Sequence, residues 1–539
     1  MKLEDLQPDA ATTLDRLRWT FSTPKFIAVT AALNALLYHL PLFSFAAGNL
    51  EILSFSGLLT LVTVLIALLS LTALLLAMLS LISYRLLKPF CMLVAISNSI
   101  AVYFLATYHV VLDKTMMGNV QNTNFAESFE LFHSTIIIYV LILGVLPCWL
   151  LSRVCVEKSS RRRLAAMALT VVVITVIWTW LASGIWGWID KNSKKLGGMV
   201  MPWSYMINAA RYEVPRLWTS DVQILLPAAT FSSNEKTIVI LVVGEAARAQ
   251  NFQLYGYNRP TNPLLAKAGV MVLKHSMACS TYTTASLRCI LSHVDSSSEF
   301  STRYEPLPSY LQRNGIDVIW RSRNSGEPSI RVQTYQRASD LMLDHPSADG
   351  DYDEVLLAGL EQRIRTSSSQ KVFVVLHQSG SHGPAYSTKY PSNFEFFKPV
   401  CRSVELGKCA KEELINAYDN TILYTDYFIS QTIGILKKLQ NTSTLLIYVS
   451  DHGESLGEYG LYLHGTPWSI APDVQKVVPF LVWMSDEFIH QRGVQPGRLE
   501  AQSSHSHRDI FHTVMGAFGM NSDAYQADHD IFNESFSSK

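Results

Sequence analysis

The sequence predicts a two-part protein: an N-terminal α-helical membrane domain with five transmembrane helices, and a C-terminal α/β/α domain. Three observations predict this fold class. Of the 539 residues, 49% are hydrophobic and only 16% are charged, and the hydrophobic residues are concentrated in the first third. Five long apolar runs lie in that third. After residue 236, short β-branched runs alternate with helical patterns, which is typical of a sheet covered by helices on both faces.

Each apolar run is long enough to cross the hydrocarbon core of a bilayer, which takes about 20 helical residues. The second run is overlong, so we expect it to tilt, bend or project from the bilayer. The first run follows a polar tail and lacks a small-residue cleavage site, so we interpret it as an uncleaved anchor. The runs cover residues 26–47, 53–83, 90–110, 132–152 and 165–187.

Lys and Arg gather in the N-terminal tail and in the loops after the second and fourth runs. Loops rich in these residues stay in the cytoplasm. The N-terminus is therefore predicted to be cytoplasmic, and the part after five crossings is predicted to lie outside. The residues concerned are Lys2, Arg16, Arg18, Lys25, Arg85, Lys88, Arg153, Lys158 and Arg161 to Arg163.

We expect three parts along the chain: a membrane domain at 1–187, a connector at 188–235 and an α/β domain outside the membrane at 236–539. Amphipathic aromatic residues make the connector suitable for the membrane interface, although an ordinary packed linker is equally compatible. The predicted buried parallel strands are Thr237–Val243, Ile316–Trp320, Val372–Leu376, Leu445–Val449 and Phe480–Trp483, and a helix is predicted at Glu412–Leu439.

Two closely spaced cysteine pairs occur in the polar part of the chain, Cys279 with Cys289 and Cys401 with Cys409. In an exported domain such pairs predict disulfides that close small loops. Buried thiols or a metal site are the alternatives, but neither pair has the CxxC spacing of a zinc knuckle. Lys+Arg and Asp+Glu both number 44, so nothing in the charge balance indicates a nucleic-acid partner.

Residues suited to metal and phosphoryl chemistry follow several predicted strands, where functional groups gather in α/β sheets. A carboxylate, an Asp-His pair and further histidines are suitable ligands for zinc. A hydroxyl beside zinc loses its proton more easily, and helix N-terminal amides stabilise negative charge. The candidates are Glu245 after IVILVVG, Thr283 in ACSTYTTASLRC, His382 in SGSHGPAYSTKYP, Asp451 and His452 after LLIYVS, and His464 twelve residues beyond His452.

Each candidate also has an ordinary interpretation. A threonine at a helix start is often a cap, and a glutamate after a strand is often a turn residue. His382 and His464 are compatible with plain loop positions. The stretch SDHGE is more specific, because Asp451 and His452 directly follow a buried strand.

Taken together, five stretches resemble the phosphoethanolamine transferases of Gram-negative bacteria, within the alkaline phosphatase and sulfatase superfamily. The lipid A-modifying branch, which includes the mobile colistin-resistance enzymes, is the most similar, and the resemblance covers nearly the whole chain. The stretches are VVGEAARAQNFQLYGYNRPTNP, CSTYTTASLRC, GSHGPAYSTKYP, AYDNTILYTDYFI and VSDHGESLGEYGLYLHGTPWSIAP.

The resemblance implies that zinc is bound by four residues: Glu245, Thr283, Asp451 and His452. It also implies that Thr283 is the nucleophile, and that His382 and His464 lie near the phosphate or a second zinc ion and serve as acid or base.

The stretch GNVQNTNFAE matches a family segment that helps to bind the lipid head group. Its key positions, Asn119, Thr123 and Glu127, are four residues apart and would share one helix face. A solvated polar helix cap is the alternative.

Two departures from the family pattern stand out. In the family's Ser-x-x-Lys stretch, Ser325 matches but Pro328 replaces the substrate-contacting lysine. We expect Arg321, Arg323 or Arg331 to supply the missing charge, and the sequence does not distinguish them. Thr284, where a small alanine is common, puts a second hydroxyl beside the nucleophile.

The implied function is transfer of phosphoethanolamine from phosphatidylethanolamine to a lipid A phosphate through a covalent Thr283 intermediate, in the bacterial inner membrane. The enzyme is expected to be a monomer among membrane lipids and to lower susceptibility to cationic peptides and polymyxin.

Three alternatives remain. The acceptor could be another molecule, such as Kdo or heptose of the lipopolysaccharide core. The domain could be a phosphodiesterase or sulfatase-like hydrolase, although a sulfatase would need a C/S-x-P-x-R setting. It could also be a non-catalytic binding module.

Overall fold

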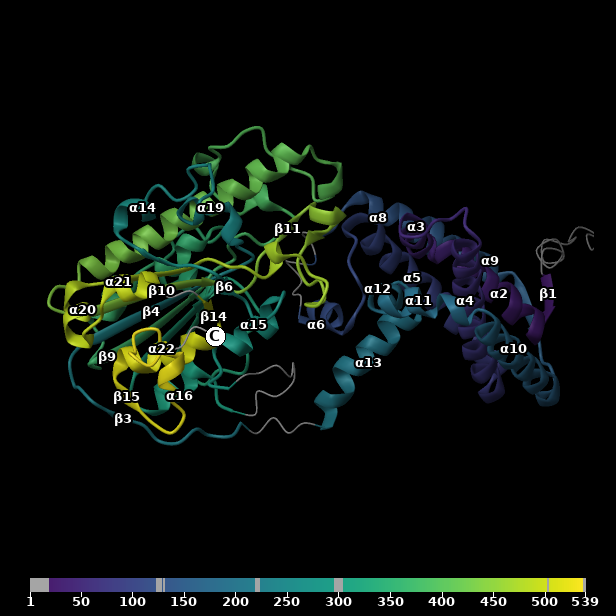
Figure 1. Ribbon diagram of the computed structural model, residues 1–539, viewed down its shortest axis with the longest axis horizontal. Helices are drawn as coiled ribbons and strands as arrows, with labels where there is room; N and C mark the ends of the chain where they lie inside the picture. Colours follow the sequence, from purple (N-terminus) through teal and green to yellow (C-terminus); the bar gives the residue numbers. More distant parts are fainter. Residues whose placement is uncertain are drawn as a thin grey trace, which may run out of the picture. The chain divides into compact units, whose positions relative to one another are not determined.

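The computed structural model describes residues 19–122, 128, 131–218, 223–294, 304–501 and 504–536. It divides into two compact units, each described by itself below (Figure 1). The first unit comprises Met1–Asp113 and His133–Ala210, and the second comprises Lys114–Phe132 and Arg211–Lys539.

The first unit is helical and contains helices long and apolar enough to cross a membrane. Within the described residues there are four such spans, or five if one bent pair counts as a single span. The bent pair is α2 (Thr23–Tyr38) with α3 (Leu40–Gly48), which meet at 59°. The four spans are α4 (Phe55–Ile82), η1–α5 (Tyr84–Tyr108), α8–η2–α9 (Ser134–Ser152) and α10 (Arg161–Leu181).

Local sequence explains how several of these helices begin and bend. The hydroxyl of Ser54 accepts a hydrogen bond from the Gly57 amide and caps α4. The hydroxyl of Ser160 caps α10 in the same way. Pro41 lies in the first turn of α3, just after the bend at His39. A short parallel pair, β1 (Trp19–Ser22) with β2 (Val154–Glu157), joins the segment before α2 to the loop between α9 and α10.

The second unit is built on a seven-stranded sheet with the order β5-β13-β10-β4-β9-β7-β8. Its five predicted strands are all present, and two short strands, β5 and β8, are added. The strands are β4 (Thr237–Gly244), β5 (Met271–Leu273), β7 (Asp317–Ser322), β8 (Thr334–Arg337), β9 (Lys371–His377), β10 (Ser443–Ser450) and β13 (Phe480–Met484).

One strand direction was predicted wrongly. Phe480–Trp483 was expected to be parallel, but β13 pairs antiparallel with β10. A parallel neighbour needs a crossover connection, usually a helix. The chain between Ser450 and Phe480 instead consists of short strands, turns and loops, and it returns to the sheet from the end at which β10 stopped.

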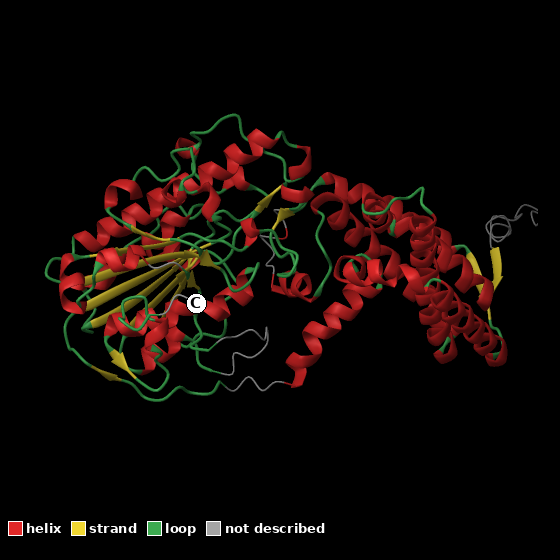
Figure 2. Ribbon diagram, viewed as in Figure 1, coloured by secondary structure: helices red, strands yellow, loops and turns green. Residues whose placement is uncertain are grey.

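Helices cover both faces of this sheet, which confirms the α/β/α fold class (Figure 2). Alternate residues of β4 face opposite cores. Val239, Leu241 and Val243 pack in one core with α16 (Leu307–Arg313) and α22 (Arg508–Phe518). Ile238, Ile240 and Val242 pack in the other with α19 (Lys411–Lys437), the helix predicted at Glu412–Leu439.

Both predicted disulfides are formed. Cys279 is bonded to Cys289 and Cys401 to Cys409. The first bridge closes the ten-residue segment that contains the start of α15 (Thr283–Ile290).

Candidate active site

The site is centred on the carboxyl ends of two neighbouring parallel strands. Glu245 follows β4, and Asp451 with His452 follows β10. The register pairs Ser450 with Gly244, and the Asp451 amide donates to the Gly244 carbonyl at 2.9 Å. Side chains from two distant segments of the sequence are therefore neighbours, and all three are fully buried.

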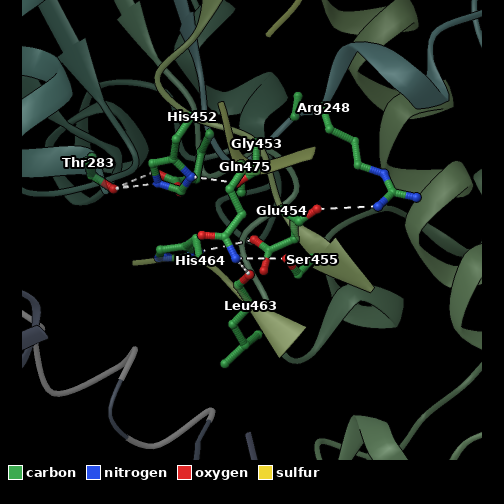
Figure 3. A network of polar contacts seen from close by, with 12 residues as sticks. Arg248, Thr283, His452, Gly453, Glu454, Ser455, Leu463, His464 and Gln475 are labelled. Carbon is green, nitrogen blue, oxygen red and sulfur yellow. Dashed lines mark hydrogen bonds and ion pairs between the residues drawn. The ribbon is translucent and has the colours of Figure 1, made fainter. Parts of the chain in front are cut away.

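Thr283 approaches this group from a different element. It is the first residue of α15, and Tyr282 before it has extended backbone. The Thr283 hydroxyl donates to Glu245 Oε2 at 3.1 Å and lies 3.4 Å from His452 Nε2 (Figure 3). The first amides of α15 are available beside this hydroxyl, where they favour negative charge.

The donor atoms fit a zinc ion. Atoms held tetrahedrally at about 2.0–2.1 Å from zinc lie about 3.3 Å from one another. His452 Nε2 lies 3.2 Å from Glu245 Oε1, 3.3 Å from Asp451 Oδ2 and 3.4 Å from Thr283 Oγ1. Glu245 Oε1 and Asp451 Oδ2 are buried and accept no hydrogen bond from the residues that the structure describes. Such orphaned carboxylate oxygens are explained by a cation between them.

The pKa shifts reflect the same crowding of charge. Burial raises the pKa of Asp451 well above its ordinary value, and the Glu245 charge adds to the rise. Burial also acts to raise the pKa of Glu245, but the charge of His452 outweighs it and the pKa falls well below the ordinary value. His452 is likewise buried, yet Asp451 and Glu245 together raise its pKa to about 10. The two carboxylates therefore favour positive charge between them.

His464 and His382 lie on the open side of this cluster. The rings of His452 and His464 are 4.2 Å apart and those of His464 and His382 are 5.4 Å apart. His464 Nδ1 lies 3.1 Å from Glu454 Oε2, so Nδ1 carries the proton and Nε2 is left for other partners (Figure 3). Glu245, His452 and His464 also form a group whose ligand atoms lie within 4.8 Å of one another.

Desolvation lowers the pKa of His382 to about 3, against the opposing charge of Glu245. The His382 imidazole is therefore neutral near pH 7. The charge of Lys389, a buried lysine, contributes to the lowering.

A buried glutamine, which the sequence did not single out, organises the loop that carries His464. Gln475 Nε2 donates to Ser455 Oγ at 2.7 Å and to Leu463 O at 3.1 Å (Figure 3). The same amide group donates to Thr466 Oγ1, and its Oε1 accepts from the Thr466 amide. A polar residue in a loop has no periodic pattern, so its partners were not predictable.

A second link joins the His464 loop to the segment that carries Thr283. The Thr281 hydroxyl donates to Thr466 O at 2.7 Å, and the Gly465 amide donates to Thr281 O at 2.8 Å. The two segments that carry Thr283 and His464 are therefore fixed to each other.

Asn324 is a second site residue that the sequence did not predict. Its Nδ2 donates to Glu245 Oε2 at 2.7 Å and to Gln378 O at 3.0 Å, so it orients the Glu245 carboxylate. The one feature of the sequence that could have indicated Asn324 is its position directly before Ser325, which was a predicted substrate-binding residue. The following Gly326 packs against Thr283 and Thr284, which brings the Ser325 turn beside the predicted nucleophile.

Two of the three arginines considered for the missing lysine point to backbone carbonyls. Arg321 is buried and donates to Leu356 O and Ala358 O. Arg323 donates to Gly350 O. Arg331 is exposed, and Pro328 is buried.

Of the predicted head-group residues, Asn119 lies on α6 (Lys114–Asn122), which belongs to the second unit. Its Nδ2 lies 2.6 Å from the place that a Cβ on Gly465 would occupy. Asn119 is thus packed against the residue that follows His464. Thr123 and Glu127 lie outside the described residues.

The α/β/α sheet with acidic and histidine side chains at the ends of β4 and β10, in one chain with an apolar helical unit, defines a membrane-anchored member of the sulfatase class. A sulfatase profile matches residues 237–520, and a profile described as phosphoethanolamine transferase EptA/EptB matches residues 43–216.

Known relatives are similar to this protein along most of its length. The chain is 38% identical to the phosphoethanolamine transferase EptA of Helicobacter pylori over 89% of this chain and 90% of that protein. It is 33% identical to the phosphatidylethanolamine transferase Mcr-1 of Escherichia coli over 82% and 85%. The solved structure of the lipooligosaccharide phosphoethanolamine transferase A of Neisseria meningitidis matches with a TM-score of 0.88 and 27% identity, over 95% of this chain and 98% of that one. The chain belongs to the phosphoethanolamine transferase family.

Proposed function

We propose that this transferase moves phosphoethanolamine from phosphatidylethanolamine to a phosphate of lipid A through a covalent intermediate on Thr283. The observation that carries the proposal is the place of the Thr283 hydroxyl, at the start of α15 and within 3.4 Å of both Glu245 Oε2 and His452 Nε2. A nucleophile needs such an activating neighbour, because a free threonine hydroxyl is weak.

In the first step, Thr283 Oγ1 forms a bond to the phosphorus, and the bond from phosphorus to the diacylglycerol oxygen breaks. Glu245 Oε2, which accepts the hydrogen bond of the attacking hydroxyl, takes its proton as the new bond forms. The leaving diacylglycerol oxygen takes up a proton, for which His464 is the acid. The α15 amides stabilise the charge that develops on the phosphoryl oxygens.

In the second step, a lipid A phosphate oxygen attacks the same phosphorus, the bond to Thr283 breaks, and Glu245 returns the proton to the threonine oxygen. His464, which gave up its proton in the first step, takes a proton from the incoming phosphate as the base, and the neutral His382 imidazole beside it can accept a hydrogen bond. The product gains an ammonium group that offsets phosphate charge, so cationic peptides such as polymyxin should bind the modified surface more weakly.

Glu245, Thr283, Asp451 and His452 are the residues proposed to hold zinc. Bound there, zinc would make the threonine hydroxyl more acidic and offset negative charge on the phosphoryl group. Asn324 and the backbone fix the ligand side chains: the Ala246 and His452 amides both donate to Asp451 Oδ1, which leaves Asp451 Oδ2 directed at the other ligands.

The proposed location is the bacterial inner membrane, with the catalytic unit in the periplasm and the enzyme acting as a monomer. The alternation of basic loops supports this orientation, and two disulfides in the catalytic unit suit an oxidising compartment. The family resemblance supports a head-group contact by residues 114–127, in which Asn119, Thr123 and Glu127 are the key positions. It also supports a contact between Ser325 and the substrate.

Intact-mass analysis of the full-length protein mixed with phosphatidylethanolamine tests the covalent step. We expect a mass gain of one phosphoethanolamine that is lost on adding lipid A and absent from Thr283→Ala. Thr284→Ala is the matched control, because it removes the neighbouring buried hydroxyl and should keep the adduct. An adduct on Thr283→Ala would refute the assignment.

The acceptor is tested separately. Mass spectrometry of lipid A and of core oligosaccharide, from cells with and without the gene, shows which one gains phosphoethanolamine. Modification of Kdo or heptose alone would replace lipid A as acceptor, and release of free phosphoethanolamine without any modified acceptor would indicate a hydrolase.

A further inference from the structure

The helical membrane unit encloses a cavity of about 420 Å³ that has no place in the transfer reaction. It is bounded by α2, α4, α5 and α9, and strand β1 closes one end. Each of these helices belongs to a candidate membrane span. Apolar side chains make up nearly the whole wall, for example Leu33, Leu37, Leu76, Val94 and Leu150.

Water is poorly suited to this cavity, because a buried water needs about 2–4 polar partners. Three of the polar side chains that line it, Asn34, Thr72 and Tyr38, are already paired within the unit. Asn34 Nδ2 donates to Thr72 Oγ1 and to Met201 O, and Asn34 Oδ1 accepts from Asn98 Nδ2. The Tyr38 hydroxyl donates to a backbone carbonyl at 2.7 Å.

An empty cavity is also unfavourable, since its lining forfeits dispersion contacts. Within a bilayer the filler at hand is a hydrocarbon chain. The lining atoms therefore favour an acyl chain over either water or vacuum.

The end closed by β1 carries positive charge. Lys25 is exposed, and its Nζ lies 4.7 Å from the ring centre of Phe21, which lines the cavity. The Trp19 amide, on another lining residue, donates to the Arg153 carbonyl at 3.1 Å. The Arg153 guanidinium lies 5.4 Å from the ring centre of Trp149, the residue before the lining residue Leu150. The carboxylate of the strand pair belongs to Glu157, which pairs with Ser22 on the Lys25 side, and the two basic residues outnumber it.

We propose that this cavity holds one acyl chain of an anionic phospholipid whose phosphate is bound by Lys25 and Arg153. Basic pockets between membrane helices on the cytoplasmic side suit anionic head groups. Both residues belong to the basic segments that are expected in the cytoplasm. Given the proposed orientation, this lipid lies in the leaflet opposite the catalytic unit, so it is a bound lipid distinct from the phosphatidylethanolamine donor.

The test measures binding of phosphatidylglycerol to the purified full-length protein by native mass spectrometry, with phosphatidylcholine as the uncharged comparison. The wild type should bind one phosphatidylglycerol in preference to phosphatidylcholine. Val94→Trp fills the cavity and should weaken this binding about tenfold, because the chain loses its place. Leu93→Trp adds the same side chain at a neighbouring position that is 66% exposed, and should bind like the wild type.

The charge is tested with Lys25→Ala/Arg153→Ala, which changes no cavity-lining residue. We expect it to lower the preference for phosphatidylglycerol over phosphatidylcholine about tenfold, since each basic residue near the surface attracts an anionic lipid. Thermal unfolding of each variant reports whether it folds. Equal phosphatidylglycerol binding by wild type and Val94→Trp would overturn the cavity as the site, and equal binding of the two lipids by the wild type would overturn the anionic head group.

Discussion

Replacing Gln475 by leucine should slow phosphoethanolamine transfer while leaving the proposed zinc ligands in place. Gln475 is fully buried and makes four hydrogen bonds of 2.7–3.2 Å to the loop that carries His464. Glu245, Asp451 and His452 stand on strand ends and need none of these bonds. Leucine keeps the bulk of the side chain and removes only its polar atoms.

The size of the loss in stability follows from the polar groups that lose their hydrogen bonds to Gln475. Ser455 is buried, and losing its partner costs about 1–3 kcal/mol. Leu463 and Thr466 are only partly buried, so water can replace their lost bonds at about 0.5–1 kcal/mol each. The total is about 2–5 kcal/mol. If about half of it falls on the arrangement that holds His464, the transfer rate falls about tenfold, since 1.4 kcal/mol is a factor of ten.

Three measurements separate the outcomes: the rate of lipid A modification by mass spectrometry, zinc content, and thermal unfolding. Gln475→Glu should be worse than leucine, because it turns a carboxylate toward oxygens that the amide had bonded. Gln440→Leu, at an exposed position, is the control and should match the wild type. Wild-type transfer by Gln475→Leu would refute the reasoning. A loss of zinc together with activity would show that Gln475 supports the metal ligands instead.

Three further predictions concern single side chains. Gly465→Ala places a Cβ 2.6 Å from Asn119 Nδ2 at a position with φ +82°, so it should cost about 1–2 kcal/mol in thermal stability and slow transfer, whereas Gly497→Ala, which meets nothing within 4 Å, should change neither. Asn324→Ala removes the 2.7 Å bond to Glu245 and should weaken zinc binding about 10–100-fold in a chelator competition, with unchanged affinity counting against its positioning role. Burial raises the pKa of Asp530 to about 7, so the folded state binds a proton that the unfolded state releases near pH 4. Stability should therefore fall by up to about 4 kcal/mol between pH 4 and 7, and Asp530→Asn should flatten this decline in pH-dependent unfolding.

The central sheet was predictable because strands that are buried on both faces consist of continuous apolar residues. β4, β9 and β10 are continuous apolar runs, and their positions followed to within two residues. The direction of β13 was not predictable, since an apolar run records burial and says nothing of the connection that precedes it. The bend at His39 was hidden for a similar reason: the apolar run continues through the break between α2 and α3.

The residues of the site can likewise be divided into those that the sequence predicts and those that it does not. Glu245, Asp451 and His452 follow buried parallel strands, and the shared edge of a sheet brings such residues together. The approach of Thr283 depends on where α15 lies, which spacing alone does not give, and only the family resemblance indicated it. Asn324 and Gln475 escaped notice because their partners lie 79 and 9 to 20 residues away in the sequence, in loops without a period.

This division has a consequence for the reaction. The cluster around His452 stands on β4 and β10, which are paired over eight residues, so it cannot shift without disturbing the core. His464 stands on a loop fixed by side-chain hydrogen bonds from Gln475 and Thr281. In the proposed two-step transfer the attacked phosphorus must stay at one place, whereas the acid of the first step and the base of the second must serve two different lipid oxygens. The strand-end residues that contact the Thr283 hydroxyl are held by the core, whereas His464, on a loop held by hydrogen bonds, has more freedom to serve both oxygens. Variants of the strand-end residues should therefore abolish metal binding and transfer together, and variants of the loop should lower the rate of transfer alone.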